Sequence, residues 1–358
     1  MPLARPHAIA PSLETARVVL AYKSFVENAL SHVGLGVTAS CTAKALRRSG
    51  VWADVWAVPT PDALVQRLRT ADADATKRGQ LPVTNVMVHA PWVPTENLAA
   101  MAAEFPNTTF TVMSHSNFGF LAADPHAVKI LREVVELQET TPNVSVAGNC
   151  KRFTDAASDM WGVPVAWLPN IYGVPSPAPS PRPPWPGDSL RLGLFGAARI
   201  LKNGLTAAAA AVLLAERLRV PTELYVSTGA EEEGTNRALT ELTDNVPNLK
   251  LVRTGWLPWT KFRSLVSNMH VLLQPSFTES FNVVTADGIA EGVPTVTSEA
   301  IDWVPSTWQA DPDDAGDVAR VAEYLLKSPK AVDDGRTALA AYVDAALGAW
   351  TGFLAPSH

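Results

Sequence analysis

One segment decides how this sequence is interpreted: Ser276-Phe-Thr-Glu-Ser-Phe-Asn-Val-Val-Thr-Ala-Asp-Gly-Ile-Ala-Glu-Gly-Val-Pro294. It lies between two apolar runs, residues 270–274 and 295–297, which are typical of buried strands. The pattern therefore predicts a strand, a loop, a short helix and a second strand. Backbone N–H groups around Asn282 would lie at the N-terminus of that helix, where the helix dipole favours a phosphate.

Two carboxylates accompany this turn. Glu279 stands just before it, and Asp287 follows eight residues later, about two turns into the helix. Carboxylate oxygens accept hydrogen bonds from hydroxyl groups. Amides that suit a phosphate, beside acceptors that suit hydroxyls, predict a ligand with both kinds of group, such as a nucleotide sugar.

The spacing of Glu279 and Asp287, followed by Glu291-Gly-Val-Pro294, resembles the acidic signature of retaining, nucleotide-sugar-dependent glycosyltransferases of the GT-B fold, and of family 4 in particular. That signature usually has Glu at both ends, so Asp287 shortens the reach to the ribose by one methylene. The resemblance implies an α/β protein with two Rossmann-like domains facing a central cleft. It also implies a C-terminal helix that crosses back to the first domain, and transfer with retention of configuration.

A second motif supports the resemblance. An apolar strand over residues 190–195 leads into the turn Gly196-Ala-Ala-Arg-Ile-Leu-Lys-Asn-Gly204. The family commonly has Arg after the first glycine and Lys five residues later. Lys202 falls on the Lys position, Ala197 stands where the Arg would be, and Arg199 lies two residues beyond it. Cationic side chains here would pair with a diphosphate, although a solvated basic turn is the alternative.

The resemblance implies a role for each residue of the donor site. Glu279 would accept hydrogen bonds from sugar hydroxyls and Asp287 from the ribose, while Lys202 and Arg199 would stabilise the diphosphate leaving group. Backbone groups of residues 255–257 would hold the nucleobase, although Trp256 is also interpretable as a rim or core aromatic. The expected donor-binding set is Gly34, Gly36, Gly255, Trp256, Leu257, Ser280, Phe281, Asn282, Val283, Val284 and Asp287.

The first half of the chain predicts a β-α-β unit that opens a parallel sheet, with strands at 17–22 and 52–58 and a helix from 37 to 49. Gly34 and Gly36 fall in the intervening loop, at the carboxyl end of the first strand, where open α/β sheets bind ligands. An ordinary entry into a helix is the alternative explanation of these glycines.

The fourth expected catalytic residue is His115, in the polar loop Ser114-His-Ser-Asn-Phe-Gly119 after a strand at 109–113. Its position resembles that of the active-site histidine near the donor sugar in several family 4 relatives. The alternative is that His115 or Asn117 only caps helix structure from Ala122 onward or satisfies local backbone groups. His89 has a similar strand-end position with fewer polar neighbours, which indicates a structural role.

The domain boundary is predicted from proline. Seven of the residues between 173 and 188 are Pro, a composition that resists regular hydrogen bonding. The 358 residues, 47% of them hydrophobic, favour two domains. We therefore expect an acceptor-side domain over 1–172, a linker over 173–188, a donor-binding domain over 189–336, and a helix and tail over 337–358.

Composition limits the remaining classes. The net charge of −6 gives no global attraction to nucleic acid or to an anionic membrane. The two cysteines are too few for a disulfide framework, the longest apolar run is too short to span a bilayer, and no signal peptide is evident, so a cytoplasmic setting is expected. No cofactor or metal is expected, since Lys and Arg can neutralise a diphosphate.

Three alternatives stay open. A GT-B-type epimerase would hold the same nucleotide sugar but make a different product. A sugar-nucleotide-binding protein without transfer activity is compatible with Ala197 and Asp287, which both depart from the family pattern. Finally, the acceptor could be a hydroxylated base in DNA, bound by basic residues that would otherwise be ordinary helix surface: Arg47, Arg48, Arg67, Arg69, Lys77 and Arg78.

Overall fold

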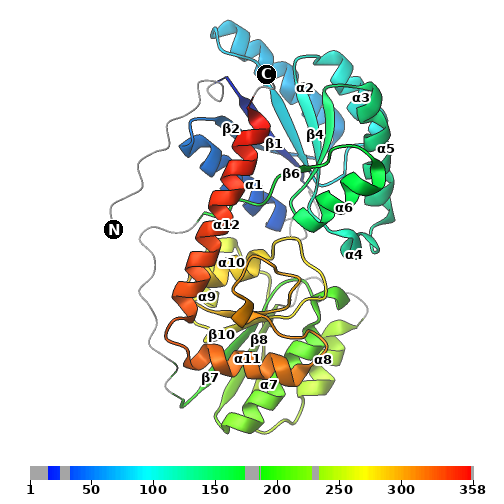
Figure 1. The fold of residues 1–358 in the computed structure, drawn as a ribbon. Coiled ribbons are helices and arrows are strands. Elements are labelled where there is room, and N and C mark those ends of the chain that lie inside the picture. Colours follow the sequence, from blue (N-terminus) through cyan, green and yellow to red (C-terminus); the bar gives the residue numbers. More distant parts are fainter. Residues whose placement is uncertain (1–14, 25–32, 174–184, 186, 228–233, 356–358) are drawn as a thin grey trace. The chain divides into compact units, whose positions relative to one another are not determined.

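The computed structural model describes residues 15–24, 33–173, 185, 187–227 and 234–355. The chain divides into two compact units, one formed by residues 1–173 with 343–358 and the other by residues 174–342 (Figure 1). Each unit contains a parallel sheet with helices packed against it, which confirms the predicted α/β class with two Rossmann-like units. The proline-rich stretch expected as a linker lies mostly outside the described residues.

The first unit contains a six-stranded sheet with the order β2-β1-β3-β4-β5-β6. Its strands are β1 (Arg17–Lys23), β2 (Trp52–Val58), β3 (Asn85–His89), β4 (Thr109–Ser114), β5 (Val144–Gly148) and β6 (Ala166–Trp167). Its helices are α1 (Val33–Arg48), α2 (Pro61–Lys77), α3 (Thr95–Glu104), α4 (Phe118–Leu121), α5 (Pro125–Thr140) and α6 (Lys151–Trp161). All neighbouring strands are parallel.

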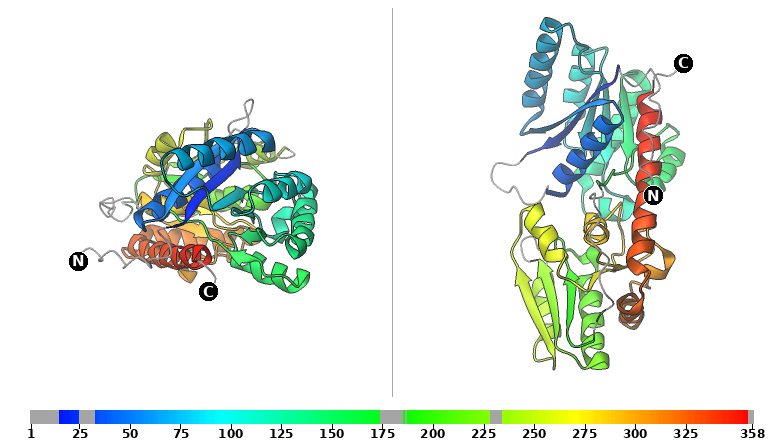
Figure 2. Two further views of the ribbon diagram at one scale, coloured as in Figure 1. Left: turned by 90° about the horizontal axis from the view of Figure 1, so that it is seen from above. Right: turned by 90° about the vertical axis from the view of Figure 1, so that its left-hand side faces the viewer.

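Alternation along these strands divides the apolar side chains between the two faces of the sheet. Val19, Val86 and Val88 belong to one continuous core with residues of α2, α3, α5 and α6. Val18 and Met87, which alternate with them, are also fully buried, and α1 contacts β1 and β2 outside that core. The sheet is therefore covered by helices on both faces (Figure 2), as a buried parallel sheet requires.

The start of α1 corrects one expectation. We expected a loop up to residue 36, but the helix begins at Val33, so Gly34 and Gly36 lie in its first turn. A Cβ atom at Gly36 would lie 3.3 Å from the Tyr22 hydroxyl, whereas one at Gly34 would meet nothing within 4 Å. Gly36 thus allows the helix to approach strand β1 closely, and the preceding residues, 25–32, lie outside the described part of the chain.

The second unit contains a five-stranded parallel sheet with the order β11-β10-β7-β8-β9. Its strands are β7 (Leu190–Leu194), β8 (Thr222–Ser227), β9 (Leu249–Thr254), β10 (Val271–Gln274) and β11 (Thr295–Thr297). Its helices are η1 (Ile200–Lys202), α7 (Gly204–Leu218), α8 (Thr235–Thr243), α9 (Trp259–Val266), α10 (Val283–Ala290), η2 (Ser306–Trp308) and α11 (Ala315–Lys327).

The strand order of the second unit fixes where a ligand would bind. The chain passes outward from β7 through β8 to β9, and then returns to the other side of β7 for β10 and β11. The order therefore reverses between β7 and β10. Loops that leave the carboxyl ends of two such strands diverge and form the ligand crevice of open α/β sheets. Here these loops are the two motifs recognised in the sequence.

The last helix, α12 (Ala331–Leu354), begins six residues before the helix expected at 337. Gly335, which weakens the helical pattern in the sequence, is required by packing: a Cβ atom there would lie 2.4 Å from Cη2 of Trp308. Tyr342 belongs to the second unit, while residues from Val343 onward belong to the first. There the buried Trp350 donates a hydrogen bond of 2.8 Å to the Pro169 carbonyl.

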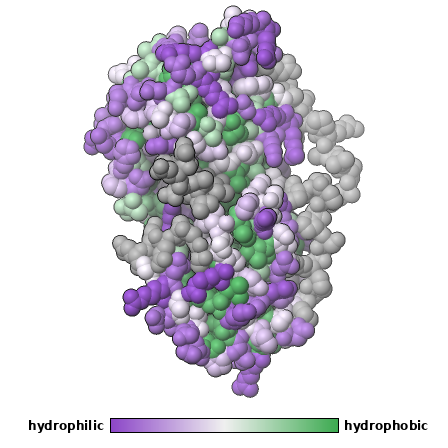
Figure 3. All heavy atoms as spheres, turned by 180° about the vertical axis from the view of Figure 1, so that it is seen from behind, coloured by the Kyte–Doolittle hydropathy of each residue, from purple (hydrophilic) through white to green (hydrophobic). Residues whose placement is uncertain are grey.

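Within the described residues, no helix combines the length and the apolar character that a bilayer span would need. Hydrophilic residues cover much of the surface drawn in Figure 3, with apolar residues in smaller areas between them.

The glycine in α12 allows a paired stability test. We expect Gly335→Ala to destabilise the protein by about 1–3 kcal/mol, because the added methyl group overlaps the buried Trp308 ring. Gly348→Ala in the same helix adds a methyl group to open space and should stabilise by about 0.5–1 kcal/mol through helix propensity. Urea unfolding followed by circular dichroism measures both changes, and equal effects would contradict this account of Gly335.

Candidate functional site

Two loops meet at the carboxyl edge of the second sheet. The first follows β7 and runs from Phe195 to Asn203, and the second follows β10 and runs from Pro275 to Asn282. They are joined by the backbone bond from Phe277 N–H to the Leu201 carbonyl, 3.0 Å, and by the bond from Asn203 Nδ2 to the Pro275 carbonyl, 3.0 Å. The structure thus brings Lys202 and Glu279 together, as the two sequence motifs predicted.

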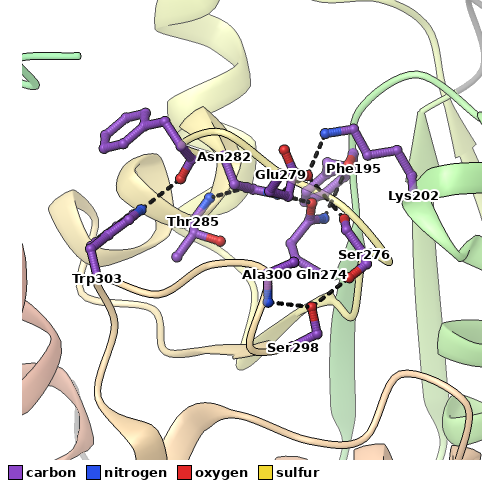
Figure 4. A network of polar contacts seen from close by, with 11 residues as sticks. Phe195, Lys202, Gln274, Ser276, Glu279, Asn282, Thr285, Ser298, Ala300 and Trp303 are labelled. Carbon is purple, nitrogen blue, oxygen red and sulfur yellow. Dashed lines mark hydrogen bonds and ion pairs between the residues drawn. The ribbon is translucent and has the colours of Figure 1, made fainter. Parts of the chain in front are cut away.

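Glu279 is the centre of a polar network between these loops (Figure 4). Its side chain is 8% exposed, and Oε1 accepts hydrogen bonds from Ser276 Oγ at 2.9 Å and from Asn282 Nδ2 at 2.7 Å. Lys202 Nζ also forms a short ion pair with this oxygen. A buried carboxylate is tolerated only where its charge is compensated and hydrogen-bonded, and these three donors provide that compensation. The Lys202 side chain is 29% exposed, so it is less buried than its partner.

Asn282 links Glu279 to the helix that follows. Its backbone has φ +64°, and its Oδ1 accepts a hydrogen bond of 2.9 Å from the Thr285 amide, which caps α10. Its Nδ2 also donates to Gln274 Oε1 at 3.1 Å, and Gln274 Nε2 donates to the Phe195 carbonyl at 3.0 Å. Residues of β7, β10 and α10 are thus tied together around the carboxylate. Asn203, with φ +56°, performs a similar turn before α7.

The N-terminus of α10 has the form predicted for an anion site. Val283 and Val284 form its first turn and are half-buried, as is Ser280 in the preceding loop, while Phe281 is 2% exposed. Because the Asn282 side chain already binds the Thr285 amide, the amides of residues 282–284 are those that face out from the helix start. These amides lie close to Glu279 in sequence, so the amides expected to bind an anion and the carboxylate expected to bind hydroxyl groups are near each other.

Asp287 occupies a different environment from the one expected. It is the fifth residue of α10, just over one turn into the helix, and it is 1% exposed. Its Oδ1 accepts a hydrogen bond of 2.9 Å from Trp259 Nε1. One turn further along α9, Arg263 forms an ion pair with Glu291, the residue directly after α10. The shortened acid is therefore part of a polar contact between α9 and α10, and its expected contact with a ribose stays a prediction.

The remaining residues of the expected donor set lie in the same unit. Arg199 is half-buried and immediately precedes η1, and its carbonyl accepts a hydrogen bond of 3.0 Å from the Lys202 amide. Gly255 is exposed, and Trp256 and Leu257 are half-buried, in the loop between β9 and α9. This loop ends at Trp259, the residue that binds Asp287.

His115, in the first unit, stacks on His89 with ring centroids 4.8 Å apart and an interplanar angle of 26°. Its Nδ1 lies 3.4 Å from Asn149 Nδ2. Burial lowers the pKa of His115 to about 4. Burial, with a smaller contribution from His115, also places the pKa of His89 well below its usual value. Both rings are therefore neutral at pH 7. Asn117 does act as a cap, but of the short helix α4, where its side chain accepts from the Phe120 amide, and not of a helix from Ala122 onward.

In the described residues, no three His, Cys, Asp or Glu side chains gather in an arrangement that could hold a metal ion. In the described network, the positive charge beside Glu279 is the ammonium group of Lys202.

Several residues of the network were not selected from the sequence. Ser276, Gln274, Asn203 and Trp259 contact the expected site residues through side chains, but single polar residues beside a strand carry no distinctive pattern. The one available signal was asparagine itself, which tolerates the left-handed conformation better than most residues. Asn203 and Asn282 both occur directly before a helix.

Comparison with known proteins gives a match over part of the chain. Residues 150–301 match the family model described as "Family 4 Glycosyltransferase in conflict systems". No curated protein matches the sequence. The matched region includes both the Lys202 turn and the Glu279 segment, so the family likeness rests on the part of the chain that forms the network.

Solved structures show the same fold over nearly the whole chain. A UDP-forming α,α-trehalose-phosphate synthase from Burkholderia xenovorans has a TM-score of 0.61 at 12% identity, with 94% of this chain and 97% of that one covered. A sucrose-phosphate synthase from Thermosynechococcus elongatus has 0.60 at 14% identity, covering 94% and 98%. A trehalose-6-phosphate structure from E. coli bound with UDP-2-fluoro glucose has 0.59 at 12%, covering 95% and 97%.

The neutral histidine pair predicts a pH dependence of stability. The pKa of His115 is about 4 in the folded protein and about 6.5 in the unfolded chain. Between these values the unfolded chain binds more protons, so stability should fall as the pH is lowered from about 6.5 towards 4. His115→Gln should flatten this slope in urea unfolding curves measured across that range. His126→Gln, at an exposed position on α5, is the control, and an unchanged slope in His115→Gln would contradict the assignment.

Proposed function

We propose that this chain, a family 4-like glycosyltransferase with the GT-B fold, transfers a sugar from a nucleoside diphosphate sugar to an acceptor hydroxyl. The observation that carries the proposal is the ion pair between Lys202 and the buried Glu279, at the edge where the strand order of the second sheet reverses. Beside the start of α10, a cation suited to phosphate, Lys202, thus contacts a carboxylate suited to hydroxyl groups, Glu279.

A bound donor would rearrange this pair. Lys202 and Glu279 form an ion pair with each other. The diphosphate of a donor would compete for the ammonium group of Lys202, since charged hydrogen bonds to phosphate oxygens are strong. Ser276 and Asn282 would continue to hold the Glu279 carboxylate, which could then accept hydrogen bonds from the sugar. Lys202 would thereby hold the diphosphate on one side of the bond that breaks, and Glu279 would hold the sugar on the other side.

The chemical step places new negative charge on the leaving diphosphate as the bond to the sugar breaks. Lys202, with Arg199 and the amides of residues 282–284, would stabilise that charge because these donors are fixed before reaction begins. Retention of configuration follows from the resemblance, and we propose it together with the activity. His115 stays the proposed fourth catalytic residue. Its neutral ring would offer a hydrogen bond rather than a positive charge.

Uridine diphosphate sugars are the first donors to test. Two of the similar structures are a synthase described as UDP-forming and one bound with UDP-2-fluoro glucose. The loop of Gly255, Trp256 and Leu257 is the proposed nucleobase site, and Gly34 and Gly36 complete the proposed donor set. No metal cofactor enters this proposal, because Lys202 and Arg199 supply the positive charge.

The alternatives predict different products. An epimerase would release an altered sugar or free nucleoside diphosphate without an acceptor, and a binding protein would retain the donor unchanged. In the DNA-acceptor alternative, phosphate groups would have to compete with existing partners, because Arg47, Arg69 and Lys77 form exposed ion pairs with Asp54, Glu104 and Asp74. Arg67 lies 4.6 Å over the ring of Trp56. These contacts satisfy most of the basic side chains that suggested a DNA track.

Ligand binding is the first test of the donor site. We expect one of UDP, GDP and ADP to raise the melting temperature, since a ligand bound only by the native state stabilises it. Lys202→Ala should weaken that diphosphate roughly 10- to 100-fold in calorimetry, because it removes a charged hydrogen bond. Lys261→Ala, at an exposed position on α9, should leave the affinity unchanged. Equal affinity for the wild type and Lys202→Ala would remove Lys202 from the site.

Turnover tests the carboxylate. Glu279→Ala should lower kcat/KM for the identified donor by roughly 10²–10³-fold, as expected when a preorganised polar contact is lost from the transition state. Glu216→Ala, at an exposed position on α7, serves as the control, and melting curves of both variants establish that they fold. Near-normal turnover in Glu279→Ala would overturn the proposed role.

A further inference from the structure

Trp303 is bound to the backbone of the Glu279 loop from a distant part of the sequence. It lies in the loop after β11, is half-buried, and its Nε1 donates a hydrogen bond of 2.7 Å to the carbonyl of Phe281 (Figure 4). Its ring also stacks on the Phe281 ring, with centroids 5.2 Å apart and an interplanar angle of 21°. Phe281 is thus held through both its side chain and its carbonyl oxygen.

The direction of one amide follows from this bond. A trans peptide is planar, and its C=O and N–H groups point in opposite directions. The carbonyl of Phe281 points at the Trp303 indole, so the N–H of Asn282 in the same peptide points away from it. This N–H is the first of the three amides that face out from the start of α10.

Because of the conformation of Asn282, the orientation of the Phe281–Asn282 peptide depends on the hydrogen bond from Trp303. Asn282 has φ +64°, a region that costs free energy for a residue with a Cβ atom. Rotation of the peptide between Phe281 and Asn282 would relieve that φ angle, and it would turn the Asn282 amide inward. The bond from Trp303 opposes this rotation, as do the bonds that the Asn282 side chain makes to Glu279 and Thr285.

We propose that Trp303 is a positioning residue for the diphosphate group of the donor, because it fixes the outward direction of the Asn282 amide. The inference rests on the proposed function, since it assigns the diphosphate to this helix start. It predicts a selective effect. Loss of the indole N–H should weaken the contact with the diphosphate, while the nucleoside, which would bind at the separate 255–257 loop, should be unaffected.

A third ring supplies a matched control. Tyr342 stacks on Phe281 with centroids 5.2 Å apart and an interplanar angle of 29°, and its centroid lies 5.5 Å from that of Trp303. Tyr342→Phe keeps this aromatic cluster and leaves the Trp303 indole bond in place. Trp303→Phe also keeps an aromatic ring against Phe281 but removes the N–H donor. The two variants therefore separate the hydrogen bond from the packing.

The experiment compares two ligands on three proteins. Calorimetry measures the affinity of wild type, Trp303→Phe and Tyr342→Phe for whichever of UDP, GDP and ADP binds best, and for its parent nucleoside. We expect Trp303→Phe to bind the diphosphate roughly fivefold more weakly, as for one lost hydrogen bond, with the nucleoside affinity unchanged. In turnover, kcat should fall more than KM rises, since the amide acts on charge that develops in the transition state. Tyr342→Phe should match the wild type in both assays.

Each other outcome has a distinct meaning. Equal weakening of diphosphate and nucleoside in Trp303→Phe would show a general loosening of the unit and overturn the positioning role. Unchanged affinity for both, with a normal melting temperature, would overturn it as well. If the wild type binds none of the three diphosphates, the proposed function itself fails, and this inference fails with it.

Discussion

The second unit is organised around one buried carboxylate. Glu279 is 8% exposed, and an uncompensated charge at that depth would cost several kcal/mol. Its compensation comes from three directions: Lys202 on the loop after β7, Ser276 on its own loop, and Asn282 at the start of α10. The requirement to satisfy one charge therefore fixes the relative position of two loops and a helix. A site with few degrees of freedom follows from this constraint.

The compensation also keeps either charge from being buried alone. The Lys202 ammonium group and the Glu279 carboxylate would each be costly if left alone in a partly buried position. In the ion pair, each side chain compensates the charge of the other. Lys202 keeps part of its side chain exposed, so it is the partner that can turn towards an incoming phosphate. Glu279 is held by two further donors and can remain where it is. The Glu279 side of the site is therefore preorganised, whereas the Lys202 side can adjust.

Much of the fold could be predicted from the sequence. The strands Trp52–Val58 and Thr295–Thr297 have the predicted bounds, because apolar runs mark them. The residues at which the helices start could not be predicted as well. Gly36 in α1 and Gly335 in α12 do not end their helices, since Tyr22 and Trp308 approach these positions closely and favour a residue without a side chain there. Local propensity disfavours such positions, and packing with residues distant in sequence decides them.

The candidate site shows the same division. Lys202 and Glu279 could be selected because each belongs to a contiguous motif with a recognisable spacing, and the structure joins them. Trp259, Gln274 and Trp303 could not, because each meets its partner only after the chain has folded. The motif indicates a ligand contact for Asp287, which stays a prediction, but it does not reveal that the Asp287 carboxylate accepts a hydrogen bond from an indole on α9. A motif specifies which residue types occur at a site, whereas burial and the partners brought by other elements decide which of their atoms remain available to a ligand.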